Sequence, residues 1–335
     1  MDRDTFVARH QQDWDRLAAL TKLSAPSAAE SDELVRLYLR ASSHLSTARR
    51  RYEDAALLLH LNTLVARANG RVYGTHPRTL RGIATAVTRT FPAAMWHLRR
   101  PILVSAAVFL VAAVLAGGWI ANSPDALDVA LPPEVREAYL TTDFENYYSS
   151  QPAGQFAASV FTNNARVGIL AFAAGILLAL PTLLVLGYNA LNVGVAAGAF
   201  HAAGRGPFFW GLILPHGLLE LTAVFVAGGT GVALGWAIIA PGDVTRSQAL
   251  ADQARRAVVV VIGLVPVFLV AGLLEAFVTP SSLPTWARVA TGALVEFTFL
   301  AYVVVFGRAA AADGWTGAAG EDRRRRPGLT ASPTS

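Results

Sequence analysis

Hydrophobic residues recur three and four positions apart through the first seventy residues, and this spacing predicts three amphipathic helices. The apolar stripes lie at residues 6–20, 34–45 and 57–68. Ser27 and Glu30 have the spacing of a capping box ahead of the second stripe, and Asn69-Gly70 is a C-terminal stop signal after the third. Three such helices predict a small antiparallel bundle with these apolar residues as its core.

Between residues 101 and 308 the pattern changes to apolar runs of about 20 residues, each long enough to cross the roughly 30 Å core of a bilayer. We therefore predict an all-α polytopic membrane protein with an N-terminal cytoplasmic helical domain. About six spans are expected, at 101–121, 165–187, 188–203, 208–240, 257–278 and 284–307. The third is either a span or a re-entrant segment, because it contains Asn189, Asn192 and His201.

Charged residues outside the spans predict the orientation of the chain. Arginines precede the first span and close the 241–256 loop, whereas residues 122–155 carry six acidic side chains and one arginine. The positive-inside rule then places both termini in the cytoplasm of a plasma-membrane protein and residues 122–155 in an outside loop. The expected organisation is a cytoplasmic bundle with a basic juxtamembrane helix at 1–98, a transmembrane domain at 99–310 and a disordered cytoplasmic tail at 311–335.

The juxtamembrane residues 78–100 combine cationic and large apolar side chains. The cationic residues are Arg78, Arg81, Arg89, His97, Arg99 and Arg100. This composition is typical of an amphipathic helix that lies on an anionic lipid surface and leads into the membrane. A second interpretation, compatible with the first, is that the arginines only fix the topology.

Composition excludes several classes of function. The chain has no cysteine, so it has neither a disulfide framework nor a thiolate metal site. The positive charge is concentrated where it orients a membrane protein, so we expect no nucleic-acid partner. No cleavable signal peptide is visible, and we find no nucleotide-binding glycine loop, no nucleophile elbow and no aspartate dyad.

The fourth expected span contains the most unusual stretch. Pro215 removes a backbone donor and Gly217 loosens the chain locally, so we expect this span to be broken. His216 and Glu220 are four residues apart and share a helical face. Ionisable residues inside a membrane are costly, and they are a functional-site hypothesis by default. The predicted binding or buried polar cluster comprises Asn163, Asn164, Arg166, Asn189, Asn192, His216, Glu220 and Glu275.

Three interpretations of this cluster remain open. In the first, ion pairs and hydrogen bonds within the cluster hold the helical bundle together, with Arg166 paired to Glu220 or Glu275. In the second, the cluster lines the polar cavity of a transport protein or permease. In the third, the cluster binds a metal. A metal site would use His216, Glu220 and Glu275, or His201, as ligands of an intramembrane metal-dependent hydrolase. Convergence of three of these four side chains would favour the enzyme. A continuous wet path would favour transport, and a closed, paired cluster would favour a structural role.

Four segments also carry a family resemblance. They are 161–167 (Phe-Thr-Asn-Asn-Ala-Arg-Val), 187–194 (Gly-Tyr-Asn-Ala-Leu-Asn-Val-Gly), 214–221 (Leu-Pro-His-Gly-Leu-Leu-Glu-Leu) and 274–280 (Leu-Glu-Ala-Phe-Val-Thr-Pro). In order and spacing, this region of about 150–310 resembles the stage II sporulation protein M family, and the N-terminal part looks like its actinobacterial branch.

The resemblance implies a function without catalysis. Founding members in endospore formers are polytopic membrane scaffolds that assemble with peptidoglycan-degrading proteins. By resemblance, this chain is expected to be an integral membrane scaffold or assembly component of a cell-envelope complex, with no cofactor. The implied partners are other membrane or envelope proteins, including a MoxR-type AAA+ ATPase or an RDD-domain protein.

Overall fold

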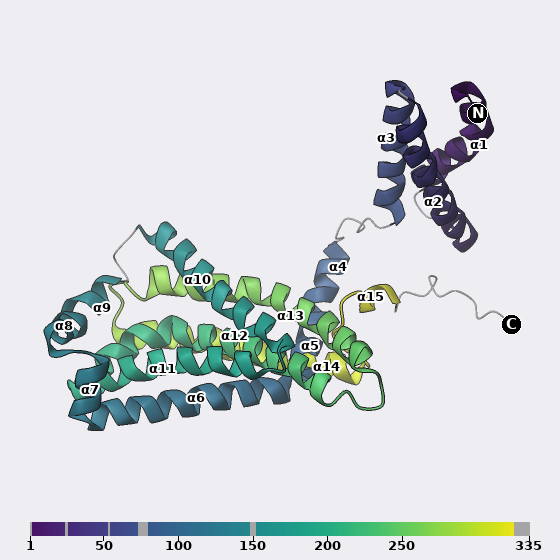
Figure 1. Cartoon of the computed structure of the whole chain (residues 1–335). Coiled ribbons are helices and arrows are strands. Elements are labelled where there is room, and N and C mark those ends of the chain that lie inside the picture. The colour runs from purple at the N-terminus through teal and green to yellow at the C-terminus, as the bar shows by residue number, and fades with distance from the viewer. Residues whose placement is uncertain (1, 24–25, 53, 73–79, 148–151, 325–335) are drawn as a thin grey trace. The chain divides into compact units, whose positions relative to one another are not determined.

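The computed structural model describes residues 2–23, 26–52, 54–72, 80–147 and 152–324 (Figure 1). The chain separates into two compact units, which are described one at a time. The first unit comprises residues 1–83 with residues 323–335, and the second comprises residues 84–322. All the regular elements among the described residues are helical, as the sequence predicts.

The first unit is a three-helix arrangement with its own core. Its helices are α1 (Arg3–Lys22), α2 (Ala28–Arg51) and α3 (Ala55–Val72). All three apolar stripes are buried against one another, with Trp14, Leu17 and Leu61 among the most enclosed side chains. The capping box of Ser27 and Glu30 is present. The predicted stop at Asn69-Gly70 is wrong, because a glycine costs a helix only about 1 kcal/mol and α3 continues for two more residues.

The second unit is built from long helices and short connecting elements. The segment before the first long helix consists of α4 (Leu80–Thr85), which begins in the first unit, then η1 (Ala86–Thr90) and α5 (Phe91–His97). The long helices are α6 (Arg99–Asn122), α10 (Ala153–Ala173), α11 (Leu180–Ala202), α12 (Gly206–Ile239), α13 (Arg246–Leu273) and α14 (Thr285–Ala312). The short elements are α7 (Pro124–Ala130), α8 (Pro133–Ala138), η2 (Tyr139–Asp143), α9 (Phe144–Asn146), η4 (Ala174–Ile176), η5 (Leu274–Val278) and α15 (Glu321–Arg324).

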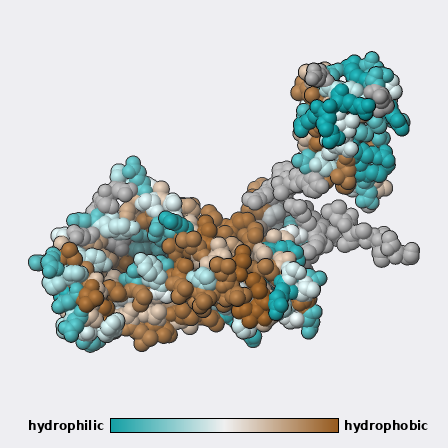
Figure 2. All heavy atoms as spheres, viewed as in Figure 1, coloured by the Kyte–Doolittle hydropathy of each residue, from teal (hydrophilic) through white to brown (hydrophobic). Residues whose placement is uncertain are grey.

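Five helices among the described residues are long and apolar enough to cross a membrane: α6, α11, α12, α13 with η5, and α14. Figure 2 shows hydrophobic residues gathered over the middle of this unit. The prediction of an all-α polytopic membrane protein is therefore confirmed. The remaining long helix, α10, packs against α12 and α13 and carries Asn163, Asn164 and Arg166, and it is not among these five.

The predicted boundary between the second and third spans is wrong. The chain turns at residues 174–179 rather than after Gly187, and α11 is one continuous helix. Leu178 and Ala179 adopt positive φ values of 57° and 66° in this turn. The turn packs closely on α12, where a Cβ added to Gly175 would overlap the backbone of Gly231. An apolar turn of this kind lacks the polar residues by which loops are recognised.

The predicted break in the fourth span is also wrong, because α12 continues as a helix through Pro215. A proline removes one ladder bond, here the bond to the carbonyl of Gly211, and membrane helices tolerate this where neighbours pack closely. Such packing is present. A Cβ added to Gly292 of α14 would overlap the Pro215 carbonyl.

The juxtamembrane segment differs from the expected surface helix. In α5 the apolar side chains of Phe91 and Met95 are buried in the core of the second unit. Gly263 of α13 lies directly against the Phe91 ring, and Gly307 of α14 lies against the Pro92 carbonyl. The segment therefore packs among the long helices, and protein rather than a lipid surface covers its apolar side chains.

Residues 313–322 of the predicted disordered tail are ordered in the structure. The buried carboxylate of Glu321 accepts hydrogen bonds from the backbone N–H groups of Thr316 and Gly317, at 3.0 and 2.9 Å. The backbone N–H of Ala319 donates to the carbonyl of Arg255. These hydrogen bonds hold residues 313–322 in place, although the composition of the segment predicts disorder. Residues 325–335, also predicted to be disordered, lie outside the described residues.

Candidate functional site

Two long helices and a π-helical turn bring three ionisable side chains together. His216 and Glu220 lie one turn apart on α12, and Glu275 lies in η5 at the end of α13. The backbone N–H of Thr279 bonds to the carbonyl of Leu274, five residues earlier, at 3.0 Å. A π-turn of this kind is frequent at functional sites. We call His216, Glu220 and Glu275 the ionisable cluster.

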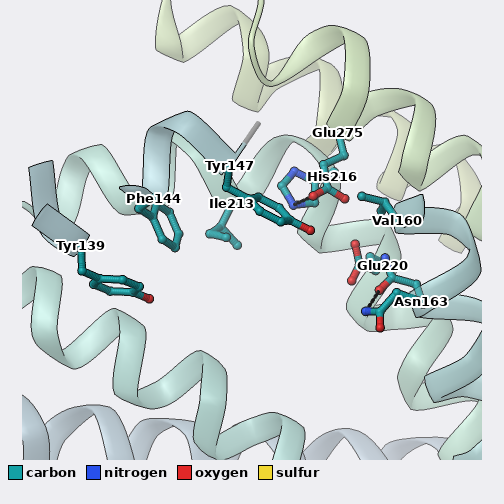
Figure 3. A pocket seen from close by; sticks show the side chains of 10 residues that line it. Tyr139, Phe144, Tyr147, Val160, Asn163, Ile213, His216, Glu220 and Glu275 are labelled. Atoms are coloured by element: carbon teal, nitrogen blue, oxygen red, sulfur yellow. Dashed lines mark hydrogen bonds and ion pairs between the residues drawn. The ribbon is translucent and has the colours of Figure 1, made fainter. Parts of the chain in front are cut away.

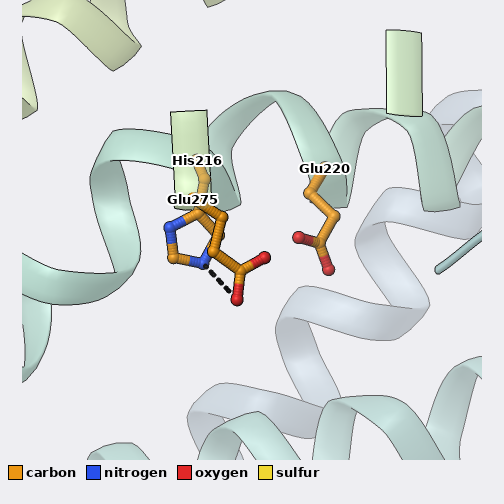
Figure 4. Close-up of side chains that lie close together, drawn as sticks. All are labelled: His216, Glu220 and Glu275. Atoms are coloured by element: carbon orange, nitrogen blue, oxygen red, sulfur yellow. Dashed lines mark ion pairs between the residues drawn. The ribbon is translucent and has the colours of Figure 1, made fainter. Parts of the chain in front are cut away.

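The ionisable cluster is compact and mostly enclosed. One candidate ligand atom from each of the three side chains lies within 4.8 Å of the other two. The Nε2 atom of His216 is 4.0 Å from Oε1 of Glu275, which is beyond direct hydrogen-bonding distance but short enough for one bridging atom (Figure 4). His216 and Glu275 are each only 5% exposed, and Glu220 is partly buried.

A hydrogen-bond chain orients the histidine ring. The Nδ1 atom of His216 is 3.1 Å from the hydroxyl oxygen of Thr279, a residue with no exposed surface. That hydroxyl in turn lies 3.4 Å from the carbonyl of Leu274, to which it donates. The Thr279 oxygen is then the acceptor for a proton on Nδ1. In this arrangement Nε2 faces the Glu275 carboxylate.

The ionisable cluster forms part of the wall of a cavity of about 480 Å³ (Figure 3). The other lining residues come from the segment before α10, from α10 itself and from α12: Tyr139, Phe144, Tyr147, Val160, Asn163, Asn164 and Ile213. The Asn163 amide donates to the Asn164 side-chain oxygen at 3.3 Å, and Asn164 and Glu220 both line the cavity. The cavity therefore presents both carboxylates and amides to whatever enters it.

Tyr147 lies beyond the membrane-spanning helices, at the edge of the cavity. Figure 3 shows its hydroxyl directed toward the side that carries Glu220 and Glu275. Partial burial raises the pKa of the Tyr147 phenol, and the two neighbouring carboxylates raise it further. The phenol therefore stays protonated at neutral pH and can act as a hydrogen-bond donor into the cavity.

Four of the predicted site residues do not line this cavity. Arg166 and Asn192 are exposed, and the Asn189 amide donates to the carbonyl of Val185 in its own helix. Among the described residues no ion pair joins Arg166 to Glu220 or Glu275, so the pairing expected from the sequence is not found. His201 is exposed and stands apart from the cluster. Its two ring nitrogens face the carbonyl of Ala197 and the indole N–H of Trp210.

Sequence reasoning missed Thr279 and Tyr147 as members of the site. The Thr279 hydroxyl lies beside a ring that is 63 residues away in sequence, and no local pattern encodes that contact. A signal for Tyr147 was present, because tyrosine at a membrane boundary favours an amphipathic, partly enclosed position. That signal predicts the depth of the ring but not its neighbours.

The ionisable cluster can bind a cation or hold protons. Two carboxylates and a neutral imidazole nitrogen present only acceptor atoms to one another unless protons are added. In a low-dielectric interior, two negative charges this close are strongly unfavourable without a compensating positive charge. A cation between the three groups, or protons on the carboxylates, supplies that compensation.

The fold and the site together define a polytopic, all-α membrane protein with an ionisable cluster at a cavity in its helical bundle. Residues 106–280 match the family model for stage II sporulation protein M. This match covers more than half of the chain and all of the ionisable cluster, and the chain belongs to that family. Residues 4–74 match a second family model, described as a domain of unknown function (DUF8413). Searches of curated proteins and of solved structures found no match.

Proposed function

We propose that the protein is a membrane-embedded assembly component of a cell-envelope complex, acting through protein contacts and without catalysis of its own. The observation that carries this proposal is the two-part architecture within a stage II sporulation protein M chain. A helical domain with its own core, matching its own family model, precedes a polytopic bundle. Because this domain has a core of its own, we infer that it serves to dock a partner.

The first unit offers a surface suited to docking. Val35 and Leu39 lie one turn apart on α2 and are 41% and 58% exposed, and Leu59 on α3 is 69% exposed. These exposed apolar side chains support the proposal that a partner covers part of α2 and α3. The partners we propose are membrane or envelope proteins, with a MoxR-type AAA+ ATPase or an RDD-domain protein as the leading candidates.

Crosslinked co-purification from native membranes tests the docking role. The deletion should remove residues 2–72 only, because α5 is part of the core of the second unit. We expect this deletion and the double variant Leu39→Glu/Leu59→Glu to lose partners that the full-length chain retains. Arg9→Glu, a charge change at an exposed position of α1, is the control. Retention of every partner after the deletion would refute docking through this unit.

We also propose that the chain lies in the plasma membrane with both termini in the cytoplasm, which requires α10 to cross the membrane in addition to the five apolar helices. Arginines at the start of α6 and α13 and at the end of α14 support this orientation. The chain has no cysteine, so single cysteines report accessibility cleanly. In intact cells, a membrane-impermeant maleimide should label Asp128→Cys in α7 and should leave Ser43→Cys in α2 unlabelled. The reverse pattern would overturn the orientation.

A second candidate function is a metal-dependent hydrolase in the membrane. One specific observation favours it: His216, Glu220 and Glu275 converge at a cavity, as a three-ligand catalytic site requires. The test is hydrolysis of peptidoglycan or of a peptide by the purified protein. Hydrolysis that is lost in Glu275→Gln and retained in Glu296→Gln would support this candidate. Hydrolysis that both variants retain would exclude this cluster as its source.

A further inference from the structure

We propose that His216, Glu220 and Glu275 bind one divalent transition-metal ion, with Zn²⁺ as the best chemical match, and that Thr279 is the positioning residue for the histidine. This inference concerns the site that the hydrolase candidate would use. It does not depend on hydrolysis, and it is compatible with an assembly role in which the ion is structural.

The ligand set fits a zinc-like ion. Zn²⁺ binds imidazole nitrogen and carboxylate oxygen at about 2.0–2.2 Å, and sites with three protein ligands keep a fourth position for water or another molecule. Mg²⁺ and Ca²⁺ prefer sites made of oxygen atoms, which a histidine ligand does not suit. One imidazole and two carboxylates therefore favour a transition metal.

The geometry requires only a small contraction. Tetrahedral ligands at these bond lengths lie about 3.3 Å from one another. The candidate ligand atoms lie within 4.8 Å, and the His216–Glu275 pair is at 4.0 Å. Both glutamate side chains have rotatable bonds through which such a contraction can occur.

The Thr279 hydroxyl favours the histidine tautomer that a metal requires. A histidine that binds a metal through Nε2 carries its proton on Nδ1 and donates it to a fixed acceptor. Thr279 supplies that acceptor at 3.1 Å, because its own proton is directed to the carbonyl of Leu274. This chain of bonds lies within the π-turn that also carries Glu275, so one element positions two of the three ligands.

Charge balance and access both favour an ion. Two carboxylates enclosed in a helical bundle are stabilised by a dication that lies between them, and the neutral histidine adds a ligand without adding charge. The cavity of about 480 Å³ borders all three ligands, so an ion has an entry path and a fourth ligand has room. The amides of Asn163 and Asn164 line the same cavity.

Metal titration of the full-length protein in detergent tests the proposal. The protein is treated with a chelator, dialysed, and titrated with Zn²⁺ or with Co²⁺, whose visible absorption reports coordination. We expect one equivalent bound per chain, with Zn²⁺ displacing the Co²⁺ band. A monodisperse wild-type protein that binds neither ion stoichiometrically at micromolar concentrations would overturn the proposal, whatever the variants do.

Variants then assign the ion to these ligands. Glu275→Gln and His216→Ala are expected to abolish stoichiometric binding. Glu296→Gln and His201→Ala, which remove a carboxylate and an imidazole outside the cluster, are expected to bind as the wild type does. Stoichiometric binding that survives both ligand substitutions would place the ion elsewhere and refute the site.

The Thr279 variants give a finer readout. Thr279→Val keeps the shape of the side chain but removes the acceptor, so we expect about 10–100-fold weaker Zn²⁺ binding. Thr279→Ser should restore the wild-type affinity. Equal affinity in all three proteins would show that Thr279 does not position the ligand. Metal binding without hydrolase activity would remove the enzyme candidate and leave the metal site intact.

Discussion

Replacing Gly198 by alanine tests the packing of α11 on α6. A Cβ at this position would lie 2.6 Å from the carbonyl oxygen of Gly117 and 2.8 Å from the Cβ of Ile120. Gly194, one turn earlier, is equally tight, because its Cβ would lie 2.5 Å from the carbonyl oxygen of Ala113. These glycines let the two helix backbones approach closely, as small residues do at helix contacts in membranes.

The magnitude follows from a matched control in the same helix. Among the described residues, no atom outside the neighbouring part of its own helix lies within 4 Å of the position that a Cβ on Gly187 would occupy. Both glycine-to-alanine changes gain about 1 kcal/mol of helix propensity, but only Gly198→Ala forces two backbones apart, at a cost of about 1–3 kcal/mol. The difference between the two variants therefore isolates the steric term. We expect Gly198→Ala to be about 1–3 kcal/mol less stable than Gly187→Ala.

The assay is equilibrium unfolding in mixed micelles of a mild detergent and dodecyl sulfate, followed by circular dichroism. Gly187→Ala should unfold at the same dodecyl sulfate fraction as the wild type or a higher one, and Gly198→Ala at a lower one. Equal midpoints for the two variants would refute the close approach of α6 and α11.

Two further predictions concern groups outside the membrane. Burial lowers the pKa of His10 and of His44, whose Nδ1 accepts the Trp14 indole proton at 3.2 Å. The unfolded chain therefore binds more protons below the ordinary histidine pKa of about 6.5, so the first unit should lose stability as the pH falls through that value. The melting temperature of residues 1–72 should drop between pH 7.5 and pH 5.5, and the drop should be smaller in His44→Gln than in the wild type. An equal drop in the two proteins would contradict this assignment. Glu321→Ala should leave buried N–H donors unpaired, which costs about 1–3 kcal/mol of stability. Residues 313–322 should then become sensitive to protease. Unchanged protease protection would contradict the role of Glu321 in holding this segment.

The first unit was largely predictable because its structure follows from local patterns. The apolar stripes, including Trp14 and Leu61, form the core, and the Ser27–Glu30 capping box starts α2 as expected. Each of these features depends on residues within a few positions of one another. The end of α3 was missed because the Asn69-Gly70 signal is weaker than the packing that continues the helix.

The membrane helices were predictable in kind but not in all their boundaries. Hydropathy identifies apolar segments, but it cannot find a turn made of apolar residues, and residues 174–179 are such a turn. Pro181, in the first turn of α11, was a usable signal, because proline is favoured there. At Pro215 the sequence predicted a break that is not present. The effect of a proline on a helix depends on the residues packed against it, here Gly292 of α14.

The candidate site was only partly predictable for the same reason. The i, i+4 spacing places His216 and Glu220 on one face, and this follows from helix geometry alone. The approach of Glu275 depends on how α13 packs against α12 and on the π-turn in η5. Arg166 and Asn192, by contrast, are polar residues that the sequence suggested for the site, but they are exposed and do not line the cavity.

Anomalous diffraction from crystals of the Co²⁺-loaded protein, collected at the cobalt absorption edge, tests the metal site most directly. We predict a single peak within about 2.0–2.2 Å of Nε2 of His216 and of one oxygen each from Glu220 and Glu275. A peak elsewhere with none at this position would contradict the account, as would a structure in which these side chains face the acyl chains.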